Sequence, residues 1–292
     1  MMRPVRGLRV ATLNLWGRQG PWEARRAVVR AALAELELDA LGLQEVLRFD
    51  AAAAPGAGGE TSDQALELAD GLGLHAAFGA ALDLGFGYSF GNAILSRFAI
   101  GKVETVGLPG APGAEPRALV AAVLHAPFGP LLFCSTHLAW RFDEGALRCR
   151  QVVAVAQAVD RMHAEAAAGF PAIVVGDFNA EPDADEIRFL RGLHVRDGAS
   201  TYFIDAFGEV GAGDGATFSR RNAYAAQVGE PDRRIDYVFV RGRDPRGFGR
   251  PVAARLAFTG SSTDTDGKPV FGSDHFGVVA ELVAPIEARS IL

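Results

Sequence analysis

The sequence predicts an α/β fold in which two mixed β-sheets pack together and carry helices on their outer faces. The chain opens with a strand, helix, strand unit. Further along, short apolar runs follow one another closely between Gly and Pro clusters, as they do in hairpins. No repeat, heptad or linker interrupts the 292 residues, so we expect a single domain over residues 1–292.

The first part of the chain begins with the strand, helix, strand unit. Residues 8–15 and 40–46 are apolar, β-compatible runs. Between them, residues 21–38 carry apolar side chains at three- and four-residue intervals, which gives a helix one buried face. Residues 51–60, rich in Ala, Gly and Pro, predict an exposed loop. A second helix with a Ser or Asp cap is expected over residues 62–71.

Short β-like runs recur in the middle of the chain, at residues 91–97, 118–124 and 131–138. Strands so close together imply hairpins. A long helix is predicted over residues 143–168, where Gly169 ends it.

The last part of the chain returns to strands. Residues 172–179 predict a strand, followed by a short helix that begins at Asp183, for which Glu186 three residues on fits a capping box. Strands at residues 234–240 and 276–283 complete the pattern.

Composition narrows the class of protein. With 49% hydrophobic and 22% charged residues, the chain has enough apolar material for a large core, which excludes global disorder. Its apolar runs are too short to span a bilayer, and no apolar signal core precedes the first strand, so we expect no transmembrane segment and a cytoplasmic protein. The net charge of −6 argues against coating nucleic acid by charge alone. Cys134 and Cys149 are expected to be reduced and buried.

Polar side chains are concentrated where the predicted strands end. A polar group at a strand end can face a crevice while the rest of the strand stays buried, which is how open α/β sheets place ligands. Each of these residues ends or interrupts an apolar run: Asn14, Glu45, His137, Asp177, Asn179, Asp236, Asp274 and His275.

Spacing suggests how some of these residues are used. Asp177 and Asn179 are two apart, so on an extended strand both side chains would project from one face. Asp274 and His275 are adjacent and can share a site only on a turn, which Gly272 before them makes plausible.

Glu45 and the amide of Asn14 supply hard oxygen ligands. The set of polar residues contains no thiolate that would favour structural zinc. The implied cofactor is therefore Mg²⁺ or Mn²⁺, as one or two ions.

In this order and at these separations, the polar motifs resemble those of the endonuclease/exonuclease/phosphatase superfamily. The match runs from about residue 8 to residue 283, and two weaker pieces, residues 91–97 and 216–218, strengthen it. The resemblance implies a four-layer sandwich: two mixed β-sheets flanked by α-helices, with the site at their common edge.

The resemblance also implies roles for individual residues. Glu45 would be the principal metal ligand, with Asn14 close by and Asp274 in the same metal and hydrogen-bond shell. Asp177 and Asn179 would orient the nucleophilic water and a phosphate oxygen. The remaining two assignments are that Asp236 holds His275 and that His137 binds phosphate or assists the leaving group.

These roles predict a metal-dependent phosphoester hydrolase, most simply a phosphodiesterase that uses a metal-activated water with His and Asp assistance. The alternatives are a nuclease acting on DNA or RNA, a sphingomyelinase-like enzyme acting on a phospholipid headgroup, and a non-catalytic binding module on the same fold. The presence of His137 makes a DNA-repair role less favoured, because abasic-site endonucleases typically lack that histidine. The motif Asn14-Leu15-Trp16-Gly17 resembles the corresponding motif of neutral sphingomyelinases.

Several other residues are candidates for substrate contacts. Arg117 and Arg141 could approach a phosphate, as could Arg148 and Arg150, and residues 211–230 could form a substrate rim. A lipid enzyme needs an apolar element that meets a membrane. The segments available for that role, residues 86–90 and 201–204, look more like core or loop.

Overall fold

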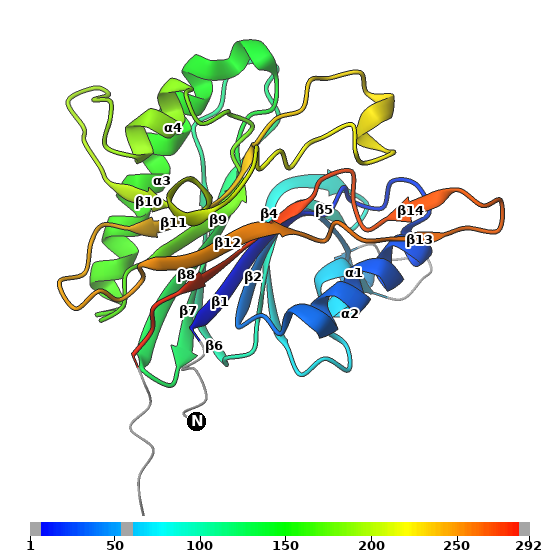
Figure 1. Cartoon of the computed structure of the whole chain (residues 1–292), viewed down its shortest axis with the longest axis horizontal. Helices are drawn as coiled ribbons and strands as arrows, with labels where there is room; N and C mark the ends of the chain where they lie inside the picture. The colour runs from blue at the N-terminus through cyan, green and yellow to red at the C-terminus, as the bar shows by residue number, and fades with distance from the viewer. Residues whose placement is uncertain (1–6, 54–60, 286–292) are drawn as a thin grey trace, which may run out of the picture.

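The computed structural model describes residues 7–53 and 61–285. Two β-sheets dominate it (Figure 1). The first has seven strands: β1 (Leu8–Asn14), β2 (Ala40–Phe49), β3 (Ser62–Asp63), β4 (His75–Gly85), β5 (Tyr88–Ser96), β12 (Pro251–Ala257) and β15 (Gly277–Leu282). The second has six: β6 (Ile100–Gly107), β7 (Ala118–Ala126), β8 (Gly129–His137), β9 (Ile173–Asp177), β10 (Phe203–Asp205) and β11 (Asp236–Arg241).

Both sheets are mixed. The first has the order β12-β15-β1-β2-β5-β4, with β3 on β2, and the second has the order β10-β11-β9-β8-β7-β6. Within them, the pairs β1–β2 and β8–β9 are parallel, and each is connected through a helix. A separate hairpin, β13 (Ser261–Thr263) with β14 (Pro269–Phe271), extends from the first sheet.

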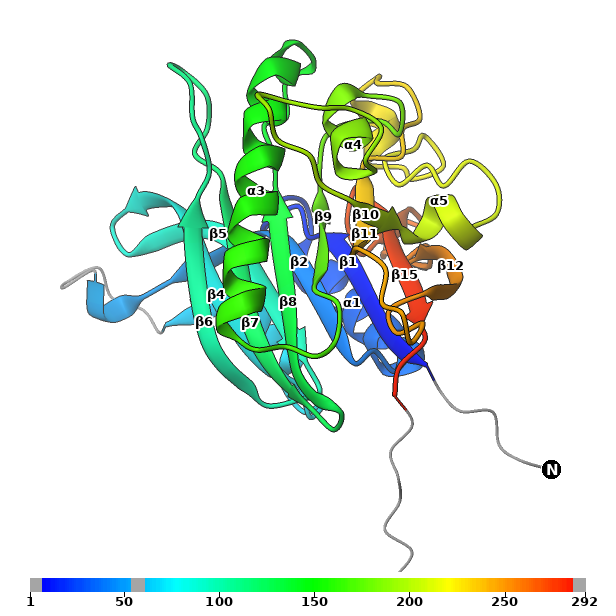
Figure 2. The same cartoon turned by 90° about the vertical axis from the view of Figure 1, so that its left-hand side faces the viewer.

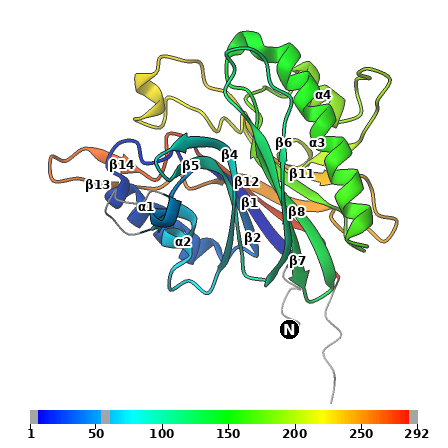
Figure 3. The same ribbon diagram turned by 180° about the vertical axis from the view of Figure 1, so that it is seen from behind.

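Helices cover the outer face of each sheet, so the molecule has four layers (Figures 1 and 3). On the first sheet lie α1 (Trp22–Leu36) and α2 (Gln64–Ala69). On the second lie α3 (Gly145–Glu165), which runs along its strands in Figure 2, and α4 (Asp185–Leu190). A short helix, α5 (Ala206–Val210), follows β10. The predicted sandwich of two mixed sheets with flanking helices is confirmed.

Alternation along the strands builds the core. Val10, Phe133 and Val238 lie in the cluster of buried side chains between the sheets. On the opposite faces of their strands, Leu13 packs with residues of α1, and Cys134 packs with residues of α3. Each central strand therefore buries both faces, as the nearly continuous apolar runs require.

The two sheets approach each other closely at Gly42 of β2. A Cβ atom at this position would lie 2.3 Å from Cγ2 of Val175 and 3.0 Å from Oγ of Ser135. Ser135 also donates a hydrogen bond to the carbonyl of Leu43 across the interface. Glycine therefore sets the separation of the layers just below the strand ends that carry the polar residues.

All the predicted strands and helices are present, with some differences in detail. The helix α4 begins at Asp185 and has Ala184 at its N-cap, so the capping box of Asp183 and Glu186 is wrong. Glu186 instead forms a buried ion pair with Arg148. In α2, Asp63 does cap the helix, by accepting from two backbone N–H groups.

Strands at the sheet edges escaped prediction. β4, β6 and β12 alternate polar, small and apolar residues and lie at or near an edge, where one face is open to solvent. The predicted loop over residues 51–60 begins with a short 3₁₀ turn at Ala51–Ala53, and its remainder lies outside the described residues. Cys134 and Cys149 are buried and free. Within the described ranges, no helix combines the length and apolar character needed to cross a membrane.

Candidate active site

Three neighbouring strands of the second sheet bring polar side chains to one edge. In the strand register, Asp177 at the end of β9 lies between His137 at the end of β8 and Asp236 at the start of β11. All three side chains are buried. The apolar strands thus hold an imidazole and two carboxylates together, although 99 residues separate His137 from Asp236.

The first sheet contributes Asn14 and Glu45 to the same edge. The amide Nδ2 of Asn14 lies 3.1 Å from Oε1 of Glu45 and 3.0 Å from Oδ2 of Asp177, and it donates to both. Its Oδ1 accepts from the backbone N–H of Trp16. One amide therefore joins a carboxylate of the first sheet to a carboxylate of the second.

Glu45 occupies a β-bulge. The pairing of β2 with β5 shifts register between Leu43 and Val46, and Glu45 has a φ of +55°, which is unusual for a residue with a side chain. Bulges redirect side chains next to functional sites. Here the bulge brings Glu45 within reach of Asn14 at the strand end.

Asp177 and Asn179 come together by a turn. The strand β9 ends at Asp177, and Asn179 has a φ of +49°, so the prediction that both share the face of an extended strand is wrong. Oδ1 of Asp177 accepts from the backbone N–H of Asn179 at 2.9 Å, a local bond that stabilises the turn. The side chain of Asn179 then reaches His137, with Nδ2 3.0 Å from Nε2.

His275 is held by two carboxylates. Its Nδ1 lies 2.9 Å from Oδ2 of Asp236, and its Nε2 lies 3.9 Å from Oδ2 of Asp177. Burial acts to lower the pKa of His275, but the charges of Asp236, Asp274 and Asp177 and the bond to Asp236 raise it to about 10. The imidazole is therefore protonated at neutral pH, with Nδ1 donating to Asp236 and a second N–H on Nε2 directed toward the charge of Asp177.

His137 has the opposite character. Burial lowers its pKa well below the usual value, and the positive charges of Arg117 and His275 lower it further. Nη1 of Arg117 lies 3.2 Å from Nδ1 of His137, and because a guanidinium can only donate, Nδ1 must accept. The proton of this neutral imidazole is then on Nε2, 3.5 Å from Oδ2 of Asp177, and Nδ2 of Asn179 donates to the carbonyl of Leu138 rather than to the protonated Nε2. The site thus contains one cationic and one neutral histidine.

Two further carboxyl groups lie in an unfavourable environment. Burial and repulsion by Asp274 raise the pKa of Glu45 to about 7. Burial raises the pKa of Asp274 as well, although His275 and Ser273 oppose the shift. A divalent cation would relieve this repulsion, and carboxylate and amide oxygens are the ligands that hard cations prefer. The residues present fit such an ion.

A second grouping could also hold a metal. Within the described residues, ligand atoms of Asp177, Asp236 and His275 lie within 4.8 Å of one another. Oδ1 of Asp236 is buried without a hydrogen-bond partner. However, both nitrogens of His275 face carboxylates that favour its protonated form, and a protonated imidazole has no lone pair for a metal. This grouping is better explained as a histidine held by its carboxylates.

A sequence model of the Endonuclease/Exonuclease/phosphatase family matches residues 11–275 of the chain. The chain belongs to this family. Membership supports hydrolysis of phosphoesters as the class of chemistry. No match was found among curated proteins.

Solved structures of this family have the same fold. An endonuclease/exonuclease/phosphatase from Beutenbergia cavernae is 26% identical, with a TM-score of 0.68 over 95% of this chain and 72% of that one. A family protein from Bacteroides thetaiotaomicron is 20% identical, with a TM-score of 0.71 over 96% of each chain. Truncated TDP2 of Caenorhabditis elegans is 21% identical, with a TM-score of 0.68 over 95% of this chain and 98% of that one.

Arg117 and Arg141, both proposed to contact substrate, lie in different places. Arg117 is buried against His137 and paired with Glu115 at 3.1 Å. The side chain of Arg141 is half exposed, pairs with Glu144 at 3.7 Å, and lies over the ring of Trp140. The structure thus brings Arg117 into the cluster of this family member and leaves Arg141 at the surface, with no contact to the cluster among the described residues.

Other arginines are not where the sequence suggested. Arg148 is buried and paired with Glu186, which removes it from the candidates for phosphate contact. Arg234 is buried and pairs with Asp205 at 2.8 Å. Arg25, which helical spacing suggests lies on a solvated face of α1, is fully buried and donates to three backbone carbonyls: those of Leu15, Gly17 and Gln19.

Several residues that hydrogen-bond to the backbone at the site were not predicted from the sequence. The hydroxyl of Ser273 donates to the carbonyl of Asn14 and accepts from the N–H of His275. Nδ2 of Asn222 donates to the carbonyl of Ser273 at 2.7 Å. The hydroxyl of Thr217 accepts from the N–H of Asp236. Thr217 could have been found from the sequence, because residues 216–218 are part of the resemblance to the family, whereas no sequence motif identifies Asn222.

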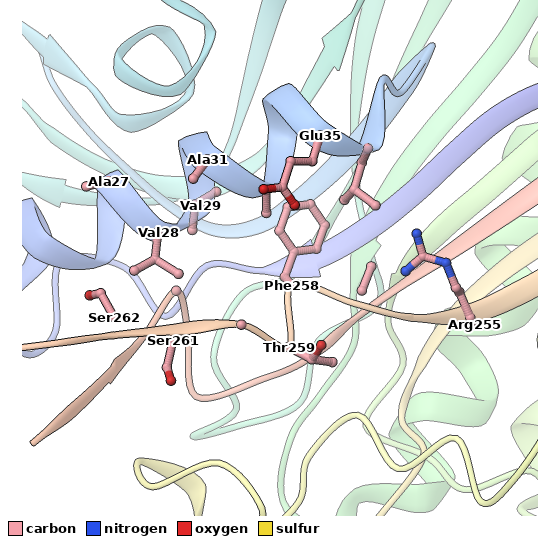
Figure 4. Close-up of a pocket in the computed structure, with 15 residues that line it drawn as sticks. Ala27, Val28, Val29, Ala31, Glu35, Arg255, Phe258, Thr259, Ser261 and Ser262 are labelled. Atoms are coloured by element: carbon pink, nitrogen blue, oxygen red, sulfur yellow. The ribbon is translucent and has the colours of Figure 1, made fainter.

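A large cavity among the described residues lies away from this cluster (Figure 4). It has a volume of about 600 Å³ and lies on the outer face of the first sheet, between α1 and the segment that follows β12. Val28, Phe258 and Thr259 are among its lining residues, and none of the polar residues of the strand-end cluster is. Cavity size alone therefore does not identify the site, which is recognised by its converging polar groups and shifted pKa values.

Proposed function

We propose that the chain is a metal-dependent phosphodiesterase. The observation that carries this proposal is the amide of Asn14, which contacts Glu45 and Asp177 at once and so unites the two sheets in one acidic centre. Glu45, Asn14 and Asp274 would hold Mg²⁺ or Mn²⁺. When bound, such an ion acts as a Lewis acid that stabilises charge on phosphate oxygens and lowers the pKa of water.

The remaining residues supply hydrogen bonds and proton transfer. Asp177 orients the attacking water and accepts its proton, with Asn179 fixing the turn beside it. His275, kept cationic by Asp236, donates to a non-bridging phosphate oxygen where negative charge builds. His137 donates from Nε2 to the phosphate or the leaving oxygen.

This proposal is tested with bis(p-nitrophenyl) phosphate in the presence of Mg²⁺, Mn²⁺ or a chelator. We expect hydrolysis with metal, its loss in chelator, and a decrease of at least about 10³-fold in kcat/KM for Glu45→Gln and His275→Ala. Glu35→Gln, a change of the same kind on the exposed part of α1, is the matched control. Activity that persists in chelator or in both site variants would overturn the mechanism, and complete inactivity of the folded parent would favour a non-catalytic binding module.

A further inference from the structure

An exposed aromatic segment follows directly after the site residue His137. Leu138 and Ala139 are buried, but Trp140 and Phe142 are 49% and 60% exposed. Two large rings on one short segment, three and five residues after a site histidine, leave apolar surface in water without serving the core.

Buried side chains hold this segment in place. Nη1 of Arg148 donates to the carbonyls of Ala139 at 3.1 Å and Arg141 at 2.6 Å, and Nη2 contacts that of Phe142 at 3.5 Å. Nε of the same guanidinium pairs with Glu186 of α4 at 2.6 Å. The rings are therefore presented on a fixed backbone, and ordering them on binding costs little entropy.

The aromatic segment is connected to the site through stacked groups. The guanidinium of Arg233 lies 4.5 Å from the ring centre of Phe142 and 5.6 Å from that of Phe218. The ring of Phe218 in turn meets that of His275 edge to face at 5.1 Å. A continuous series of ring and guanidinium contacts thus connects His275 to Phe142.

We propose that Trp140 and Phe142 stack on an unpaired base of a single-stranded nucleic-acid substrate. The inference rests on the proposed function, because the adjoining phosphodiester would then occupy the site. Aromatic side chains next to a phosphate-binding site bind bases through their π-faces, with little preference for sequence. In a duplex, neighbouring bases cover those faces, so a single strand is required.

The local charges agree with stacking rather than with a long phosphate track. Arg141 pairs with Glu144, and Arg233 pairs with Glu230. Each guanidinium beside a ring is therefore balanced by a carboxylate, and the whole chain is acidic with a net charge of −6. Binding that depends on two rings should have a shallow salt dependence.

The same groups disfavour a phospholipid. A choline headgroup is a cation, and the guanidinium groups over Trp140 and Phe142 already interact with the ring quadrupoles that it would bind, whereas a base is uncharged and stacks on the exposed part of a ring. Asp143 and Glu144 follow at once in the chain and would repel an anionic membrane.

Binding is measured by fluorescence anisotropy with a labelled, phosphorothioate-linked hexathymidylate in Mg²⁺, so that no cleavage occurs. We expect Phe142→Leu and Trp140→Leu to raise Kd by roughly 5- to 100-fold, the range found for one base stack. Phe142→Tyr, which keeps the ring, should restore binding. Val252→Ala, an exposed apolar side chain on β12, should bind like the parent. A strand of the same length with abasic residues should bind weakly to every form.

Cleavage of the phosphodiester-linked strand gives a second readout. In Phe142→Leu, KM should rise by a similar factor while kcat stays within about twofold, because the ring acts on binding. Equal Kd values for the parent and both Leu variants would overturn the proposal, as would equal losses on abasic and duplex strands. Binding to sphingomyelin vesicles that depends on Phe142 would also overturn it.

The two proposals can fail separately. If the parent binds the strand in a base- and Phe142-dependent way but hydrolyses no phosphodiester with either metal, the aromatic subsite stands and the proposed function is wrong. If the parent hydrolyses all strands with no dependence on Phe142, the proposed function stands and the subsite is wrong.

Discussion

At the end of β1, an amide does what a carboxylate could not. Asn14 donates to Glu45 and to Asp177 from one nitrogen. A carboxylate of the same shape has no proton to donate at neutral pH, and it would add a third negative charge to a buried acidic pair. The residue type at this position therefore follows from the neighbours that it joins.

The Asn14→Asp variant tests this role. We expect kcat/KM to fall by about 10²-fold or more and the free energy of unfolding to fall by about 1–3 kcal/mol, because two donor contacts become repulsive. Steady-state kinetics and urea unfolding provide the measurements. Asn92→Asp is the control, since Asn92 is a buried amide that donates to the carbonyl of Ala118 away from the site. It should lose stability and keep its kcat; the idea fails if both variants behave alike.

Arg117 has a more indirect effect, on the tautomer of His137. The contact of its Nη1 with Nδ1 places the imidazole proton on Nε2. In Arg117→Met, which keeps much of the side-chain volume, we expect kcat to fall about tenfold or more while KM changes less, because the donor toward the reacting groups is lost. Arg117→Lys should recover part of the rate. A change confined to KM would instead indicate a direct phosphate contact.

Among secondary-structure elements, buried strands were predictable and edge strands were not. β1, β2, β8 and β9 have apolar residues on both faces, so their sequences alone identify them. The structure also places polar residues at the strand ends, as the sequence predicted. The bulge at Glu45 and the left-handed turn at Asn179 were not predicted, because neither involves the Gly residue that usually marks such backbone.

Contacts between charged side chains and groups distant in the sequence could not be predicted from the periodicity of the helices either. Helical spacing places Arg25 among charged neighbours, but its guanidinium lies over the rings of Trp16 and Trp22, 4.9 and 5.5 Å from their centres. Nothing within α1 reveals that the loop after β1 turns its carbonyls toward this side chain. Such contacts depend on tertiary packing, which periodicity does not contain.

The close packing of the two sheets at Gly42 leads to a prediction about stability. Gly42→Ala should destabilise the protein by about 1–3 kcal/mol, because the added Cβ would meet Val175 of the opposite sheet at 2.3 Å. Gly107→Ala on β6 is the matched control, since a Cβ there meets nothing within 4 Å. Thermal unfolding distinguishes them, and equal melting temperatures would show that the layers can separate at no cost.

Taken as a whole, the metal-free molecule should become less stable as pH rises. The pKa of Glu45 is raised to about 7, so its protonated form favours folding below the ordinary value of 4.5 and that contribution is lost as pH rises through 7. The pKa of His275 is raised to about 10, so its stabilisation is complete below 6.5 and is lost as pH approaches 10. Both groups act in the same direction.

Melting temperature in chelator and in excess Mg²⁺ measures this effect. We expect the rise in Tm on adding Mg²⁺ to grow between pH 5 and pH 8, because the ion competes with the proton on Glu45. Glu45→Gln should remove most of this metal effect. In the metal-free protein at pH 8, the same substitution should raise Tm, because it raises the free energy of unfolding by about 1–3 kcal/mol. An equal Mg²⁺ effect in parent and variant would place the ion elsewhere.

The bridge made by Asn14 has a consequence for synthesis of the chain. Its partners come from residues 45 and 177, and the adjoining turn at Ser273 fastens to the carbonyl of Asn14 near the other end of the sequence. During synthesis, the centre can therefore close only after the chain has emerged from the ribosome as far as Ser273. Recovery of activity after dilution from denaturant should therefore lag behind recovery of the circular dichroism signal of helices and strands.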